Sequence, residues 1–180
     1  MAPHRLLLVA CVGEGALALA ALAWIEWRDL AVARGPGITG AVAGVAAAAA
    51  LAAGNFWLLT AAPDVAPVRS VRRLYLEVLA PLFARVRVID VALISGAAGL
   101  CEELFFRGAV QAEWGLWPAS VLFGVMHLGG GGTLAFGVWV AIMGAALGGL
   151  AIWSGGLLAP IVAHALYDAA AIAYIRWGRS

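Results

Sequence analysis

The longest stretch of the chain without an aspartate, glutamate, lysine or arginine is 54 residues, from Trp114 to Tyr167. Because about 20 apolar residues cross the hydrocarbon core of a bilayer, this stretch is long enough for two crossings joined by a turn. The whole chain of 180 residues is 64% hydrophobic and only 12% charged. These values exclude an ordinary water-soluble enzyme and an intrinsically disordered chain. We therefore predict an all-α, polytopic membrane protein.

Apolar segments divide the chain into a bundle of about six transmembrane helices. We expect them at residues 6–25, 37–62, 88–106, 117–128, 133–153 and 156–175. Pro63 ends the second helix, in which Gly40 and Gly44 have the spacing that lets helices approach closely. A cleaved signal peptide is the alternative for the first segment, but its length and Glu14 favour a retained helix. Glu14 is expected to face the bundle interior or to lie near the membrane surface.

Residues 68–84 differ in kind from the membrane helices. Apolar residues recur there at steps of three and four, and arginines occupy the other faces. This pattern predicts an interfacial amphipathic helix, with its apolar side at the acyl boundary and its arginines at the headgroups. A basic, solvated loop is the alternative interpretation.

Charge also bears on orientation and partners. Five arginines lie from Arg69 to Arg87, which predicts that this connection is cytoplasmic. Six crossings then place both termini in the cytoplasm and Glu102 near the outer end of its helix. The net charge of +1 argues against nucleic acid as a partner. Every basic residue is arginine, which we interpret as the codon bias of a bacterial genome, so the predicted location is the bacterial inner (cytoplasmic) membrane.

We expect one integral membrane domain over residues 1–180. Residues 1–87 would supply two N-terminal helices and the basic interfacial helix, and residues 88–175 would form a catalytic helical core. The cysteines Cys11 and Cys101 both lie in apolar stretches. They form no metal-binding or disulfide pattern, so we interpret them as packing residues.

Polar residues within the apolar segments gather at three places. A charged side chain deep in a membrane helix costs about 2.5–3.5 kcal/mol on insertion scales, so such residues mark functional sites by default. The three sequences are Cys-Glu-Glu-Leu-Phe-Phe-Arg at 101–107, Phe-Gly-Val-Met-His at 123–127 and His-Ala-Leu-Tyr-Asp at 164–168. Together they hold more polar groups than helix adhesion requires.

Helical geometry restricts what each group can do. Glu103 and Arg107 are four residues apart and can form an ion pair on one face. Glu102 is rotated by about 100° from Glu103 and need not share that arginine. This division predicts one structural and one free carboxylate. Each of the three sequences, taken singly, also has a purely structural interpretation. Glu103–Arg107 could be a snorkelled ion pair, His127 a hydrogen-bonded core histidine, and His164–Asp168 an interhelical polar clamp.

The ordered set Glu-Glu-x-x-x-Arg, Phe-x-x-x-His and His-x-x-x-Asn/Asp resembles the CPBP family, named for CAAX prenyl proteases and bacteriocin-processing enzymes (also called ABI). Members are glutamic-type intramembrane endopeptidases, and the small size of this chain is similar to that of the myxosortase subgroup. The resemblance covers residues 88–175. It implies hydrolysis of a peptide bond in a membrane-anchored or lipid-proximal protein or peptide substrate, within the lipid bilayer and without a cofactor.

The resemblance also implies a role for each matching residue. Glu102 would activate water with help from His127, and His164 and Asp168 would hold the oxyanion. Glu103, Arg107 and Phe123 would support them. An ionised Asp168 would repel an oxyanion, so it must be protonated or act by orienting His164.

Three other interpretations stay open. Glu102, His127, His164 and Asp168 form a plausible zinc set, so a zinc-dependent membrane protease could use the same residues. The chain lacks His-Glu-x-x-His, which favours the glutamic mechanism. A non-catalytic immunity or binding factor on the same fold is the second alternative. The third is a small proton-coupled transporter, against which we find no inverted repeat.

Overall fold

The computed structural model describes residues 3–128 and 133–178, and all regular structure within them is helical. Two long helices come first, α1 (Pro3–Arg28) and α2 (Gly37–Thr60). A broken helix follows, made of α3 (Ala66–Arg73), the π-helical turn η1 (Leu74–Leu79) and α4 (Ala80–Phe83). The remaining elements are α5 (Val88–Glu103), the π-helical η2 (Leu104–Val110), α6 (Gln111–Trp114), α7 (Leu116–Met126), α8 (Leu134–Ser154) and α9 (Leu158–Trp177).

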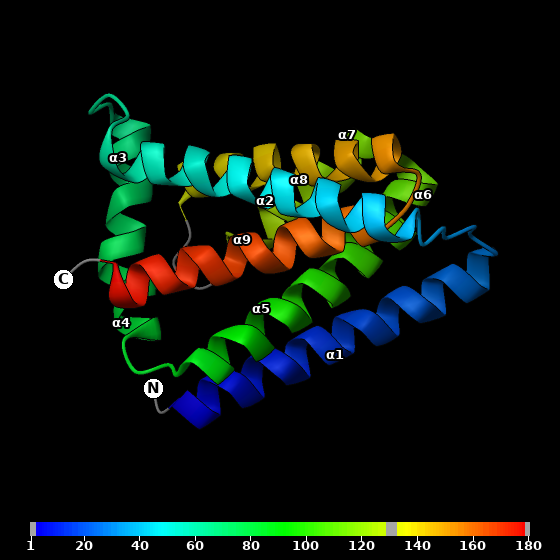
Figure 1. Ribbon diagram of the computed structural model, residues 1–180, viewed down its shortest axis with the longest axis horizontal. Helices are drawn as coiled ribbons and strands as arrows, with labels where there is room; N and C mark the ends of the chain where they lie inside the picture. Colours follow the sequence, from blue (N-terminus) through cyan, green and yellow to red (C-terminus); the bar gives the residue numbers. More distant parts are fainter. Residues whose placement is uncertain (1–2, 129–132, 179–180) are drawn as a thin grey trace.

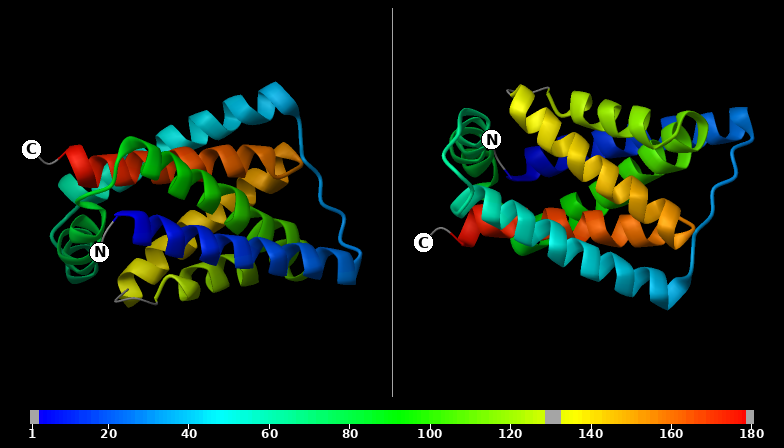
Figure 2. Two further views of the ribbon diagram at one scale, coloured as in Figure 1. Left: turned by 90° about the horizontal axis from the view of Figure 1, so that it is seen from below. Right: turned by 90° about the horizontal axis from the view of Figure 1, so that it is seen from above.

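The long helices lie side by side in a bundle, and α3, η1 and α4 stand across one of its ends, close to both chain termini (Figures 1 and 2). Helix α9 packs between α2 and α5, and α7 packs on α8. The amphipathic segment is therefore helical, and the alternative of a solvated loop at residues 68–84 is wrong. Its Arg72 donates hydrogen bonds to the carbonyl oxygens of Leu58 and Ala62, which satisfies carbonyls at the end of α2.

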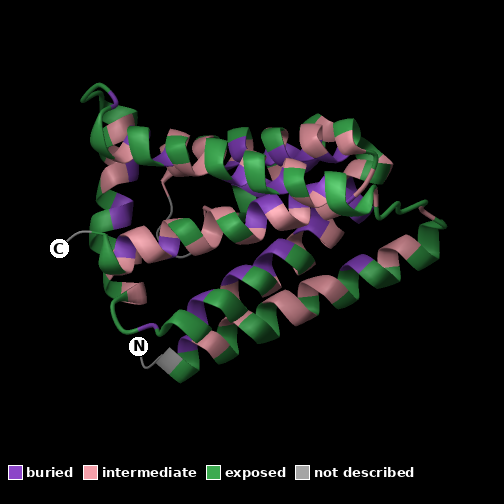
Figure 3. Ribbon diagram, in the orientation of Figure 1, coloured by how far each residue is buried: buried purple, intermediate pink, exposed green. Residues whose placement is uncertain are grey.

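Figure 3 shows which residues of the bundle are exposed and which are buried. Many of the exposed residues are large and apolar, and several of the buried ones are polar or charged, which is the reverse of a soluble protein. Large apolar side chains such as Leu19, Ile38 and Trp153 are exposed. The buried polar and charged residues are Asn55, Asp90, Ser95, Glu103, Arg107, Ser120 and His164. Lipid solvates an apolar exterior, whereas polar groups at membrane depth must face protein or a water-filled cavity.

Among the described helices, α1, α2, α8 and α9 are long and apolar enough to cross a membrane. Helix α7, with 11 residues, is shorter than a span. The expected number of six crossings therefore stays a prediction, whereas four candidate spans support an integral, multi-pass membrane protein.

The third predicted helix is longer than its expected range of 88–106. Helix α5 starts at a capping box in which Asp90 accepts hydrogen bonds from Arg87, and the helical path then continues through η2 and α6 to Trp114. Glu102 thus precedes the end of this path by about 18 Å at 1.5 Å per residue. The expectation that Glu102 lies near a helix end is wrong, because the π-helical turn carries the chain past Phe106 without breaking it.

Helix α1 is attached to Glu113 of α6 by polar contacts near the other end of the bundle. Arg28 Nε donates to Glu113 Oε1 at 2.9 Å, and Trp24 Nε1 donates to Oε2 of the same carboxylate. The loop that follows α1 lies against the turn between α8 and α9, where the amide of Leu157 donates to the carbonyl of Ala33 at 3.0 Å. These contacts fix both the position and the rotation of α1 beside α5.

Candidate active site

The site begins where α5 and α9 come unusually close. A Cβ atom at Gly99 would lie only 2.8 Å from the backbone nitrogen of Ala165, so only glycine permits this approach without a shift. Glu102 and Glu103 follow one turn later on α5, and His164 directly precedes Ala165 on α9. The close approach of α5 and α9 therefore brings the carboxyl groups of Glu102 and Glu103 near the imidazole of His164 inside the bundle.

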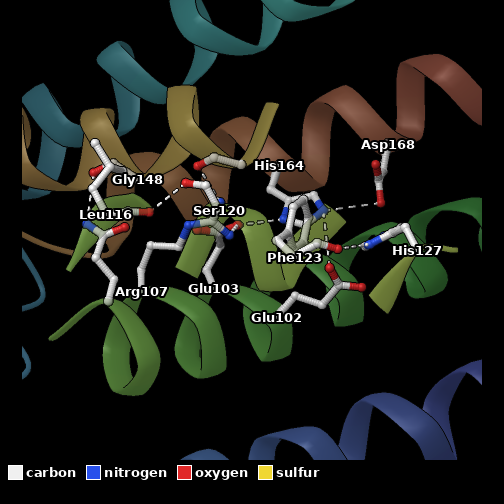
Figure 4. A network of polar contacts seen from close by, with 12 residues as sticks. Glu102, Glu103, Arg107, Leu116, Ser120, Phe123, His127, Gly148, His164 and Asp168 are labelled. Carbon is white, nitrogen blue, oxygen red and sulfur yellow. Dashed lines mark hydrogen bonds and ion pairs between the residues drawn. The ribbon is translucent and has the colours of Figure 1, made fainter. Parts of the chain in front are cut away.

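Glu103 holds His164 and Arg107 at once. Its Oε1 atom accepts a hydrogen bond from Arg107 Nη1 at 2.8 Å and one from His164 Nδ1 at 2.7 Å (Figure 4). Arg107 Nη2 also donates to the carbonyl oxygen of Gly144 on α8 at 2.7 Å. The expected ion pair between Glu103 and Arg107 is thus present, and its contact with His164 makes it the support of an imidazole ring.

The other nitrogen of His164 faces two further carboxylates. Its Nε2 atom lies 3.6 Å from Asp168 Oδ2 and 4.0 Å from Glu102 Oε2. Both distances are longer than a direct hydrogen bond. The side chains of Glu102 and Asp168 are 14% and 28% exposed, whereas Glu103 is completely buried.

His127 has its own fixed orientation. Its Nδ1 atom lies 2.8 Å from the carbonyl oxygen of Phe123, and because a carbonyl can only accept, Nδ1 carries the proton. Nε2 of a neutral ring is then left as the acceptor. The Phe123 ring lies beside both imidazoles, with centroid distances of 4.6 Å to His127 and 5.9 Å to His164, and the Arg107 guanidinium lies 4.9 Å from the same centroid.

A cavity of about 280 Å³ brings these groups together. Glu102, His127, His164 and Asp168 all line it, from α5, the end of α7 and α9. Most of its other lining residues are apolar or aromatic. Tyr75 of η1 and Phe83 of α4 line it from the end of the bundle. A carboxylate, two imidazoles and a second carboxyl group around a largely apolar cavity are suited to acid–base chemistry on a bound substrate.

The four residues proposed from the sequence as a catalytic or zinc-binding set thus border one cavity, but they are not in mutual contact. No hydrogen bond joins Glu102 to His127 within the described ranges. Among residues 3–128 and 133–178, no three His, Cys, Asp or Glu side chains are arranged to hold one metal ion.

Reasoning from the sequence missed one feature of the site, and for Glu14 it left open whether the side chain faces the bundle interior or lies near the membrane surface. The sequence suggested that Asp168 could orient His164. In the structure Glu103 makes the hydrogen bond to His164 Nδ1, and Asp168 lies on the opposite side of the ring. Glu14 of α1 also lines the cavity. The signal for Glu14 was its position as the sole charged residue within an apolar helix of about 20 residues.

Comparison with known proteins concerns mainly the second half of the chain. Residues 84–170 match a family model described as Type II CAAX prenyl endopeptidase Rce1-like. Over 96 residues the chain is 28% identical to the uncharacterized protein YpbD of Bacillus subtilis (strain 168), a match that covers 53% of this chain and 51% of that relative. No solved structure gives a significant match. The match to the family model covers just under half of the chain and supports membership of the CAAX protease and bacteriocin-processing family.

Proposed function

We propose that this family member is a glutamic-type endopeptidase of a bacterial inner membrane that hydrolyses a peptide bond in a membrane-anchored or lipid-proximal protein. Glu102 activates the attacking water with His127 as its partner. His164 and Asp168 stabilise the oxyanion, and Glu103, Arg107 and Phe123 hold the catalytic groups in place.

The observation that carries this proposal is the pair of contacts made by Glu103. Because Glu103 accepts from both Arg107 and His164 Nδ1, the His164 ring is held from its buried side. Its Nε2 atom is thereby turned toward the cavity that Glu102 and Asp168 border. A donor held in advance at such a position stabilises developing negative charge without reorganisation during the reaction.

The reaction balances with these groups alone. Glu102 takes a proton from water while the water oxygen attacks the carbonyl carbon of the scissile peptide. Negative charge forms on the carbonyl oxygen, and the imidazolium form of His164 donates to it through Nε2. The C–N bond then breaks, and the proton held by Glu102 passes to the leaving nitrogen.

Asp168 acts in its neutral form. It lies on the cavity side of His164, where a second negative charge beside Glu102 would oppose formation of the oxyanion. A protonated carboxyl group instead donates a hydrogen bond to that oxygen. Asparagine, which the family pattern also permits at this position, would donate in the same way.

The test is a cleavage assay with the whole protein in liposomes. The substrates are membrane-anchored peptides with one transmembrane helix and randomised flanking residues, and mass spectrometry identifies the products. We expect cleavage by the wild type in the presence of a chelator, and its loss in Glu102→Gln. Glu26→Gln, which changes an exposed glutamate of α1, is the matched control.

Each contrary outcome has a definite meaning. Activity that disappears with chelator and returns with zinc would replace the glutamic mechanism by the zinc-dependent one. Wild-type cleavage by Glu102→Gln would remove Glu102 from the reaction. Absence of any product from the wild type across the whole set of peptides would contradict an endopeptidase.

A further inference from the structure

Glu14 reaches the candidate active site from a helix that lies outside the region matched to the family. The match covers residues 84–170, whereas Glu14 is on α1, which lies along α5 (Figures 1 and 2). Its side chain is half-buried and lines the same cavity as Glu102. The family motifs therefore give no role to this carboxyl group.

The rotation of α1 directs Glu14 inward. Ala21 and Arg28 follow Glu14 at steps of seven residues, so the three side chains share one face of the helix. Ala21 is fully buried, and Arg28 is bound to Glu113 of α6. Because Ala21 and Arg28 are held against neighbouring helices, the face of α1 that they share with Glu14 is turned toward the inside of the bundle.

The side chains of Glu14 and Glu102 line the same cavity, Glu14 from α1 and Glu102 from α5. Oε2 of Glu14 and Oε2 of Glu102 are both buried, and neither has a hydrogen-bond partner among the described residues. The nearby imidazoles are directed elsewhere, since His164 Nδ1 contacts Glu103 and His127 Nδ1 contacts the Phe123 carbonyl.

Two ionised carboxylates that face one largely apolar cavity repel each other, and neither of these Oε2 atoms has a donor among the described residues. One proton between them removes both costs, because a neutral carboxyl group donates to the charged one. Asp168 and His164 also line this cavity. The contact between His164 Nε2 and Glu102 Oε2 is 4.0 Å, which is too long for a direct hydrogen bond.

We propose that Glu14 is a positioning residue, whose neutral carboxyl group donates a hydrogen bond to Glu102 and holds that carboxylate toward the substrate water. Helix α1 thereby completes the active site. This inference rests on the proposed function of Glu102 as the general base. An ionised Glu14 that binds a cationic group of the substrate is the contrary case, and glutamine separates the two because it keeps a donor and has no charge.

The experiment compares Glu14→Gln, Glu14→Ala and the exposed control Glu26→Ala in the liposome cleavage assay, with thermal unfolding measured on each. Loss of a hydrogen bond to a charged group predicts that kcat falls about tenfold to a hundredfold in Glu14→Ala, with KM nearly unchanged. Glu14→Gln should keep kcat within about threefold of the wild type, since its amide replaces the donor. Equal losses in both variants, or no loss in Glu14→Ala, would overturn the proposal.

A second measurement does not depend on activity. Infrared difference spectroscopy at neutral pH, on proteins that also carry Asp168→Asn so that the neutral carboxyl group of Asp168 gives no band, should show a protonated-carboxyl band that disappears in Glu14→Gln and persists in Glu26→Gln. A band that persists in Glu14→Gln would overturn the shared proton. Failure here is distinct from failure of the proposed function: if Glu102→Gln is inactive and Glu14→Ala is fully active, only the role of Glu14 is lost.

Discussion

The two sides of the His164 ring differ in how their polar groups are used. On the sealed side, toward Glu103 and Arg107, the contacts are direct hydrogen bonds of 2.7 and 2.8 Å between side chains that are at most 6% exposed. On the cavity side, toward Glu102 and Asp168, the separations are 3.6 and 4.0 Å and the carboxyl side chains are 14% and 28% exposed. The sealed side has the features of a structural support, and the cavity side has those of a reaction site.

This difference arises from one step along a helix. Glu102 and Glu103 are adjacent in sequence, but a rotation of about 100° separates their side chains. One carboxylate is directed into the bundle against Arg107, and the other into the cavity. The same residue type thus serves two purposes. Substitutions on the sealed side should mainly lower stability, and substitutions on the cavity side should mainly lower cleavage.

The largest effect on stability is expected when the sealed side is broken. Arg107→Ala leaves the fully buried Glu103 without its cation, which predicts a loss of about 3–5 kcal/mol in the free energy of unfolding. Thermal or denaturant unfolding in detergent measures it. Arg28→Ala, which removes the half-exposed partner of Glu113, is the control and should cost about 1 kcal/mol or less. Equal losses in the two variants would contradict a special role for the sealed side.

A smaller effect is expected from Gly99→Ala, where α5 meets α9. The added Cβ would lie 2.8 Å from the backbone nitrogen of Ala165, and such overpacking costs about 1–3 kcal/mol. Cleavage should also fall, because Glu102 and His164 are moved apart. Gly96→Ala, three residues earlier on the same helix, adds a methyl group with no heavy atom within 4 Å and should leave both properties unchanged. Indistinguishable variants would show that the close approach is not needed.

The smallest effect is expected on the cavity side from Asp168→Asn. Asparagine is similar in shape and donates a hydrogen bond without a charge, so cleavage should stay within about tenfold of the wild-type rate and stability should not change. Asp168→Leu, which has no donor, should lose about a hundredfold or more. A complete loss of cleavage in Asp168→Asn would show that this residue acts as a charged group.

Much of the fold follows from apolar periodicity. The first two helices, the amphipathic helix and the last two helices lie within a few residues of their expected ranges, because a membrane span needs an uninterrupted apolar stretch. Reasoning from the sequence failed at Phe106, where helix continues to Trp114. The apolar run stops at the charged Arg107, whereas a π-helical turn continues the helix and buries Arg107 against α8.

Local spacing predicted contacts within a helix better than contacts between helices. The pair Glu103–Arg107 depends on one turn of helix, so it is visible in the sequence. The bond from His164 to Glu103 joins residues 61 positions apart, and the approach of Glu14 to the cavity depends on the rotation of α1. Both are set by helix packing, which residue spacing alone does not determine.

The central claim is that the two adjacent carboxylates have different tasks, and paired measurements on Glu102→Gln and Glu103→Gln test it most directly. Cleavage in liposomes and unfolding in detergent are measured on both variants at equal amounts of folded protein. We predict that Glu102→Gln loses at least about a hundredfold in cleavage at wild-type stability, since a general base supplies about 10²–10⁴-fold, and that Glu103→Gln unfolds more easily. Wild-type cleavage by Glu102→Gln, or a greater loss of stability in Glu102→Gln than in Glu103→Gln, would contradict this account.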